Sequence, residues 1–227
     1  MKATRTDLET EYHGLKIMAA ANLHKECISV IEGLDLPIGA KAIDLGAGEG
    51  AFSLRLVDKG FNVLAVEREI DRFKVKIPCL QLDLNSDFVD KIGVKVDLVV
   101  GIEIIEHLQN PRQFMVNCLN LLRDHGYLMI TSPNLESWVS RIRFLRDGQF
   151  MWFEKGDDER WGHITPIFSW QIERICRETG ATLLEISHTK SKLLWNELCD
   201  RLSGLLRNKT VYLGILYPFM RGVRMGR

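Results

Sequence analysis

A glycine-rich turn between a candidate strand and a candidate helix constrains the fold of this chain more than any other feature. Residues 41–45 are mostly apolar, as in a buried strand, and residues 51–57 carry apolar side chains at helical spacing. The turn between them is Asp44-Leu45-Gly46-Ala47-Gly48-Glu49-Gly50. Glycines adopt positive φ and let a ligand approach the main chain, and a helix that begins there presents unpaired N–H groups. The segment predicts a nucleotide-like cofactor site in an α/β fold.

Three acidic residues stand at the ends of successive candidate strands. Asp44 lies two residues before the first glycine of the turn, Glu67 closes the strand at 62–67, and Asp83 follows the apolar segment 79–82. In open α/β sheets, ligands bind at the carboxyl ends of the strands. We expect Asp44 to face the cofactor there, where an anion suits a ligand that carries positive charge. Glu67 can accept hydrogen bonds from both hydroxyls of a ribose.

The rest of the chain alternates between candidate strands and helices, which predicts a parallel sheet with helices on both faces. Further strands are expected at 96–100, 127–131 and 182–188, and helices at about 8–31, 110–123 and 169–179. We expect one domain over residues 1–188. In it, an N-terminal lid helix (within about 1–33) covers the cofactor cleft, and an insert (about 135–166) contacts the substrate. Residues 189–227 form a basic, aromatic C-terminal tail.

The composition bounds the class of protein. Of the 227 residues, 46% are hydrophobic, enough for a sizeable core, and the formal net charge of +0 gives no global field that attracts nucleic acid. The five cysteines are scattered and lack a Cys-x-x-Cys spacing, which favours reduced thiols over disulfides or a zinc site. The sequence starts without an apolar signal region, and no apolar run reaches the ~18 residues of a membrane span. We therefore expect a cytoplasmic protein.

The order of these motifs resembles the class I S-adenosylmethionine (SAM) dependent methyltransferases over roughly residues 40–188. The resemblance extends to the type 11/23-like branch and to the ubiquinone-pathway O-methyltransferases. It implies a Rossmann-like, seven-stranded, mostly parallel sheet with an antiparallel last strand. It also implies that the turn, with Gly46, Ala47, Gly48 and Gly50 after Asp44, holds the methionine end of SAM. Glu67 would then bind the ribose hydroxyls, and Asp83 with the amide of Leu84 would bind the adenine edge.

A second cluster, Glu103-x-x-Glu106-His107, follows the strand at 96–100. If this segment forms one helical turn, the three side chains share a face. Two carboxylates and an imidazole can chelate a divalent cation, or His107 can act as a base. In a third interpretation, Glu106 merely orients His107, and Glu103 lines the SAM site through its backbone.

The cluster, together with Thr131-Ser132-Pro133-Asn134 and the later His163, is also similar to the small-RNA 3′-terminal 2′-O-methyltransferases. That resemblance implies a metal ion (Mg²⁺, Mn²⁺ or Zn²⁺) held by Glu103, Glu106, His107 and His163. The segment 162–168, however, is closer to a histidine and phenylalanine motif of a branch with mixed substrates. The chain also lacks the large accessory domains of the RNA branch, so a nucleic acid acceptor is not favoured.

Two further regions bear on the methyl acceptor. The insert carries Arg141, Arg143 and Arg146 among aromatic residues, which would suit a phosphate-bearing or aromatic substrate. The segment from Arg201 to Arg227 has six Lys or Arg and no acidic residue around the ten-residue run 211–220. This run is too short to span a bilayer; it would suit peripheral contact with a membrane interface, or packing on its own domain or on a second copy.

We expect a SAM-dependent methyltransferase that methylates an oxygen of a small-molecule, quinone-like or glycan- or lipid-linked acceptor by direct displacement. His107 is the candidate catalytic base. The spacing Gly46-x-Gly48-x-x-Ala51 leaves a nicotinamide-dependent, NAD(P)-binding oxidoreductase as an alternative, against which Asp44 and the lack of a Tyr-x-x-x-Lys set argue. The sequence also leaves open an RNA 3′-end methyltransferase and a SAM-binding regulator without turnover.

Overall fold

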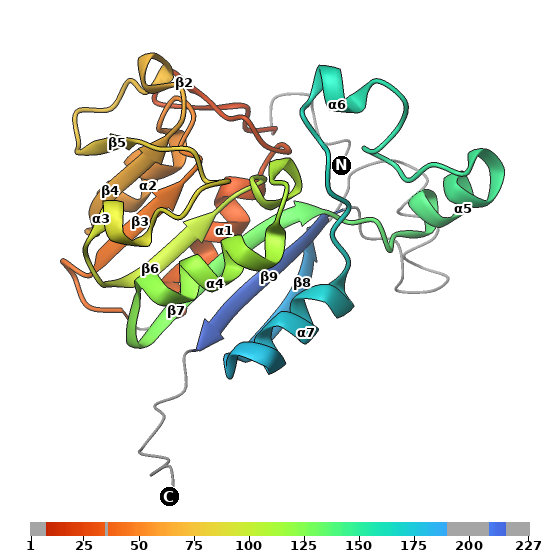
Figure 1. Ribbon diagram of the computed structural model, residues 1–227. Helices are drawn as coiled ribbons and strands as arrows, with labels where there is room; N and C mark the ends of the chain where they lie inside the picture. The colour runs from red at the N-terminus through yellow and green to blue at the C-terminus, as the bar shows by residue number, and fades with distance from the viewer. Residues whose placement is uncertain (1–7, 35, 190–208, 217–227) are drawn as a thin grey trace, which may run out of the picture.

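The computed structural model describes residues 8–34, 36–189 and 209–216. Its central sheet has the strand order β5-β4-β3-β6-β7-β9-β8 (Figure 1). The strands are β3 (Lys41–Leu45), β4 (Asn62–Glu67), β5 (Cys79–Gln81), β6 (Val96–Gly101), β7 (Leu122–Pro133), β8 (Thr182–Thr189) and β9 (Lys209–Leu216). The strands from β5 to β7 pair in parallel, whereas β9 is antiparallel to both β7 and β8. The predicted Rossmann-like α/β class is confirmed.

Both faces of the sheet are covered by helices, which explains why its central strands are apolar on both sides. Successive side chains of a strand point to opposite faces of the sheet. Ala42 packs with α1 and α2 on one face, whereas Ile43 packs toward α3, α4 and α7 on the other. The helices are α1 (Leu23–Glu32), α2 (Ala51–Asp58), α3 (Val89–Ile92), α4 (Pro111–Leu121), α5 (Trp138–Asp147), α6 (Asp157–Arg160) and α7 (Ser169–Thr179), with short 3-10 turns η2 (Ile70–Arg72) and η3 (Ile105–His107). In Figure 1, α5 and α6 stand beyond the carboxyl end of β7, outside both helical layers.

The predicted N-terminal lid helix is wrong over most of its length. Residues 11–16 form a hairpin of β1 (Glu11–Tyr12) and β2 (Leu15–Lys16), and the helix α1 begins only at Leu23. His13 and Gly14 turn the chain with φ of 48° and 77°, values that a right-handed helix does not allow.

The hairpin is anchored on α2 by Arg55, whose side chain is 8% exposed. Its guanidinium lies 2.7 Å from the Glu9 carboxylate and 3.9 Å from the centroid of the Tyr12 ring. The Tyr12 hydroxyl also donates a hydrogen bond of 2.7 Å to Asp58. This anchor leads residues 16–20 past the glycine-rich turn, so the N-terminal segment borders the cleft as extended chain.

The domain boundary predicted at residue 188 is also wrong, because β9 lies in the sheet between β7 and β8. Its residue Tyr212 is in register with Ile130 of β7 and Ile186 of β8. Residues 211–216 of the run assigned to a tail therefore belong to the sheet, whereas 217–220 lie outside the described residues. Among the described residues, no helix combines the length and apolar character needed to cross a membrane.

Candidate active site

A cleft of about 630 Å³ opens at the carboxyl edge of the parallel strands, where ligands bind in such sheets. The cleft is lined by parts of several segments. Outside the insert these are residues 16–20, Gly46 and Gly48 of the turn, parts of 66–72 and of 102–108, and 82–85; from the insert they are Trp152 and residues 161–163. The cleft thus brings together residues that are far apart in the sequence.

The glycine-rich turn needs glycine for two separate reasons. Gly46, Gly48 and Gly50 have φ of 78°, 56° and 93°, where residues with a side chain are strained. A Cβ atom at Gly46 would also lie 2.8 Å from Ile104 Cδ1. Gly46 and Gly48 line the cleft. Ala47 and Gly50 belong to the same turn but do not line the cleft. Gly50 begins helix α2 as its N-cap residue.

Glu67, at the end of β4, holds the turn to the neighbouring strand. One carboxylate oxygen accepts the N–H of Gly48 at 2.8 Å, and the other accepts the N–H of Glu69 at 3.0 Å. Asp83 lies on the same cleft and accepts the N–H of Asn85 at 2.9 Å, and Leu84 beside it is buried. The predicted meeting of Glu67 and Asp83 at the glycine-rich turn is therefore present in the structure.

Asp44 does not face the cleft, so that part of the prediction is wrong. Its side chain lies beneath the turn, 2% exposed, and accepts a hydrogen bond of 2.6 Å from the Ser53 hydroxyl of α2. Burial raises the pKa of Asp44 from 3.8 to about 6, although the hydrogen bond from Ser53 opposes this shift. At neutral pH the carboxylate is ionised, and it places negative charge under the turn.

This shift predicts a pH dependence of stability that depends on one side chain. The folded state binds the Asp44 proton more tightly than the unfolded chain does, so protonation of Asp44 contributes to the free energy of unfolding. This contribution is complete below pH 3.8 and is lost as the pH rises to about 6. Asp44→Asn keeps an acceptor for Ser53 without the charge. Relative to wild type, its free energy of unfolding should rise by up to about 3 kcal/mol between pH 4 and pH 7. Urea denaturation at several pH values measures this difference, and a pH-independent difference would contradict the assignment.

Glu103 has a strained backbone at the bottom of the cleft. Its φ is 51°, a left-handed value that costs a residue other than glycine about 1–3 kcal/mol. Thr131 of β7 holds it there: its hydroxyl accepts the N–H of Glu103 at 2.9 Å and donates to the Glu103 carboxylate at 3.2 Å. The condition under which Glu103, Glu106 and His107 would share a face, one common helical turn, is therefore not met, since the turn η3 includes only the latter two.

His107 and His163 meet beside the buried Glu106. One ligand atom from each of the three side chains lies within 4.8 Å of the others, a candidate cation site that does not include Glu103. The two imidazole rings have an edge-to-face arrangement with centroids 4.9 Å apart. The structure thus brings together three of the four residues for which the sequence predicts a metal.

Backbone carbonyls fix the tautomers of both imidazoles. His107 Nδ1 lies 3.0 Å from the Gly162 oxygen, and His163 Nδ1 lies 2.8 Å from the Trp152 oxygen. Because a carbonyl only accepts, Nδ1 of each neutral ring donates to it, and Nε2 then carries the lone pair. The backbone of Glu103 also makes a hydrogen bond with the His107 ring and, like that of Gly162, raises the pKa of His107 against the effect of burial. Burial, and secondarily the charge of His163, lowers the pKa of His107, so its neutral form prevails at pH 7.

Some residues of the cleft gave no signal in the sequence. Arg68 and Arg72 follow Glu67 and line the cleft, yet in the sequence neither differs from an ordinary solvent-exposed arginine. The sequence predicts a helix over residues 16–20, because the hairpin that positions them depends on the contacts of Arg55, which join distant segments. Gly162 lines the cleft and supplies the carbonyl for His107, and only its φ of 78° distinguishes it.

Comparison with known proteins adds a family match. Residues 19–186 match a family model described as a methyltransferase domain. Two curated ubiquinone biosynthesis O-methyltransferases are similar to this chain. That of Rickettsia akari is 28% identical over 137 residues, which cover 56% of this chain and 49% of that protein. That of Erwinia tasmaniensis is 26% identical over 115 residues, which cover 46% of this chain and 47% of that protein. The chain thus spans about half the length of these curated relatives.

Solved structures show the same fold at low sequence identity. A SAM-dependent methyltransferase from Archaeoglobus fulgidus has a TM-score of 0.58 at 18% identity, covering 84% of this chain and 90% of that one. Phosphoethanolamine N-methyltransferase 2 from Haemonchus contortus, in complex with SAM, has a TM-score of 0.61 at 13% identity, covering 86% and 52%. At these identities the similarity concerns the fold.

Proposed function

We propose that this chain, which belongs to the methyltransferase-domain family, is a SAM-dependent methyltransferase that transfers the methyl group of SAM to a hydroxyl oxygen of a small-molecule acceptor. The observation that carries the proposal is the position of His107. A neutral imidazole with its lone pair on Nε2 borders the same cleft as the glycine-rich turn. The names of the similar curated proteins, which are O-methyltransferases, support oxygen as the methylated atom.

The residues of the cleft fit SAM. Gly46 and Gly48 line the cleft with bare backbone, which lets the methionine end of the cofactor approach the main chain closely. Glu67 is placed to accept the ribose hydroxyls, and Asp83 with Leu84 to contact the adenine edge, by resemblance to the family. When bound, SAM supplies a methyl group on a cationic sulfur. The ionised Asp44 beneath the turn contributes a favourable negative potential for such a cation.

In this proposal His107 acts as the base that deprotonates the hydroxyl of the methyl acceptor. An alcohol or phenol loses its proton as its oxygen forms the new bond, and the Nε2 lone pair of His107 can accept that proton. Gly162 holds the ring in the required tautomer through Nδ1. The walls of the cleft hold the hydroxyl in one orientation, which lowers the entropic part of the barrier.

The first test is methyl transfer from labelled SAM to a panel of acceptors and to a cell extract, with the product identified by mass spectrometry. A product methylated on oxygen is expected. SAM binding without transfer would indicate a regulator, and a methylated nitrogen or RNA end would contradict the proposed acceptor. Binding of NADH in place of SAM would support the oxidoreductase alternative.

Contact of the C-terminal residues with a membrane, and a lipid-linked acceptor, remain predictions.

Glu106, His107 and His163 also offer a carboxylate and two imidazoles, a donor set that fits Zn²⁺ or Mn²⁺ better than Mg²⁺. The lone pair on His107 Nε2 cannot accept a proton and bind a metal at the same time. We therefore expect dialysis against EDTA to leave the methylation rate unchanged, and added Mg²⁺, Mn²⁺ or Zn²⁺ to have no effect. Loss of activity that one of these ions restores would replace the base with a metal-assisted hydroxyl.

A further inference from the structure

Two tryptophans of the insert border the same cleft as His107. Trp152 is partly buried, whereas Trp161 is 54% exposed, and both are among the lining residues. Trp161 directly precedes Gly162, whose carbonyl binds His107, and the carbonyl of Trp152 binds His163. The backbone of each tryptophan is therefore tied to the imidazole pair.

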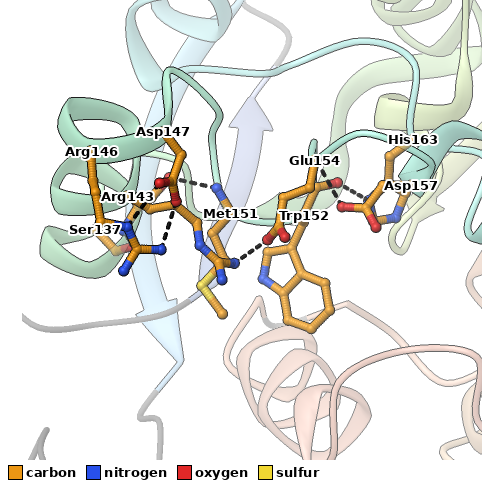
Figure 2. Close-up of polar contacts among 10 residues, drawn as sticks. Ser137, Arg143, Arg146, Asp147, Met151, Trp152, Glu154, Asp157 and His163 are labelled. Atoms are coloured by element: carbon orange, nitrogen blue, oxygen red, sulfur yellow. Dashed lines mark hydrogen bonds and ion pairs between the residues drawn. The ribbon is translucent and has the colours of Figure 1, made fainter.

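A network of polar contacts holds Trp152 in an unusual conformation (Figure 2). Its φ is 73°, a value that normally requires glycine. On one side, the N–H of Met151 donates to the hydroxyl of Ser140 in α5 at 3.2 Å. On the other side, Glu154 is paired with Arg143 of α5, and its N–H donates to Asp157 at 2.9 Å. The chain is thus held on both sides of Trp152, at residues 151 and 154.

The same network continues to the second tryptophan. The backbone carbonyl of Asp157 accepts the N–H of Trp161 at 2.8 Å and the N–H of Gly162 at 3.1 Å. Asp157 is buried, and its carboxylate is the acceptor for Glu154. One buried aspartate therefore connects the segments that carry the two tryptophans.

The arginines of the insert do not line the cleft. Arg143 pairs with Glu154, and Arg146 forms two hydrogen bonds with Asp147, at 2.8 and 2.6 Å, as Figure 2 shows. Arg141 lies by the ring of Trp138, with its guanidinium 5.8 Å from the centroid. The insert thus contributes two tryptophans and no cation to the lining of the cleft, whose cations Lys16, Arg68 and Arg72 come from other segments. The side of the cleft that the insert forms therefore favours a planar ring.

We propose that Trp152 and Trp161 are specificity residues that form an aromatic wall for the acceptor, which therefore carries its hydroxyl on a planar conjugated ring. Indole rings provide a large, rigid apolar surface and stack on flat π systems in offset or edge-to-face geometry. A saturated ring of the same skeleton lacks both the flat face and the π system. The inference rests on the proposed O-methylation and adds the class of acceptor.

The test measures acceptor binding without turnover, with S-adenosylhomocysteine in place of SAM. Calorimetry compares 2-naphthol with decahydro-2-naphthol, which has the same carbon skeleton and hydroxyl position but no planar ring. Wild type should bind 2-naphthol at least about 10-fold more tightly than its saturated analogue, since stacking contributes only to the planar ligand. Equal affinities, or no binding of 2-naphthol, would overturn the proposal.

Trp152→Gly separates the ring from the backbone, because glycine retains the left-handed conformation that directs the carbonyl to His163. Trp152→Gly and Trp161→Leu should each weaken 2-naphthol binding about 10-fold or more, with S-adenosylhomocysteine binding unchanged. Trp170→Leu is the matched control, since Trp170 is 55% exposed and is not a lining residue of the cleft; it should bind like wild type. Trp152→Gly with wild-type affinity would remove Trp152 from the wall.

Methyl transfer is measured separately, so that the two proposals fail independently. The protein could bind 2-naphthol tightly through the two tryptophans, yet leave it unmethylated and methylate nitrogen instead. This result would contradict O-methylation and leave the aromatic wall. O-methylation of flat and saturated alcohols with equal kcat/KM, unaffected by the Trp152 and Trp161 variants, would contradict the wall and leave O-methylation.

Discussion

Replacing His107 with alanine is expected to lower kcat by about 10²–10⁴-fold, the usual contribution of a positioned general base. The expectation follows from the neutral ring at the cleft: when its Nδ1 donates to the Gly162 carbonyl, its Nε2 carries the lone pair that can take the proton of the methyl acceptor. The affinity for SAM should stay within about twofold, because the residues proposed to bind SAM lie elsewhere in the cleft. Steady-state kinetics with labelled SAM, together with calorimetry, measure both quantities.

Chemical rescue distinguishes a base from a structural role. Added imidazole should restore part of the activity of His107→Ala, since a small base can enter the space that the side chain leaves, whereas a folding defect would not respond. His125→Asn provides the matched control, because His125 is exposed and lies at the opposite end of β7 from the cleft. Retention of wild-type kcat in His107→Ala would eliminate His107 as the base.

Replacing Glu67 with alanine is expected to raise the Kd for SAM about 100-fold, which corresponds to about 2.7 kcal/mol. The Glu67 carboxylate accepts two backbone N–H groups, from Gly48 and Glu69, and would also bind the ribose hydroxyls. Hydrogen bonds to a charged group contribute about 1.5–3 kcal/mol each, so the loss of the ribose contacts and of the ordered turn accounts for this magnitude. Isothermal calorimetry with SAM measures the change directly.

Two further variants refine this prediction. Glu67→Gln keeps one oxygen that can accept the Gly48 N–H but loses the charge, so its affinity for SAM should lie between those of wild type and Glu67→Ala. Glu185→Ala changes an exposed acid of β8 outside the cleft and should bind SAM normally. If Glu67→Ala bound SAM as wild type does, Glu67 would serve only to order the turn, and the ribose assignment would be lost.

The sequence was sufficient to predict the α/β class and the edge of the sheet where the cleft lies. The turn from Gly46 to Gly50 has a local signature, since the positive φ of its glycines depends on the residues themselves. Glu67 and Asp83 follow from the same logic, because strand ends in a parallel sheet meet at one edge. Asp44 faces the other way because its partner, Ser53 of α2, lies below the turn, and no spacing rule indicates this contact.

Errors arose where distant contacts decide between two local patterns. Leu15 fits the helical period that continues to Leu23 of α1, yet residues 11–16 form a hairpin, because Arg55 binds Glu9 and Tyr12. Short apolar runs do not distinguish a strand from an amphipathic tail, so the sequence predicts residues 211–216 as part of a tail; the structure favours the alternative that this run packs on its own domain, where it forms a strand. Likewise, Glu103 leaves the turn of Glu106 because Thr131, on another strand, holds it.

The position of β9 has a consequence for biosynthesis. Within the described chain, β8 pairs with no strand other than β9, and β9 joins it to β7. A nascent chain that has not yet released residues 209–216 from the ribosome therefore presents β7 with an unpaired edge, and β8 has no place in the sheet. Exposed strand edges attract other chains, so this interval of translation leaves an edge at which the nascent chain can aggregate.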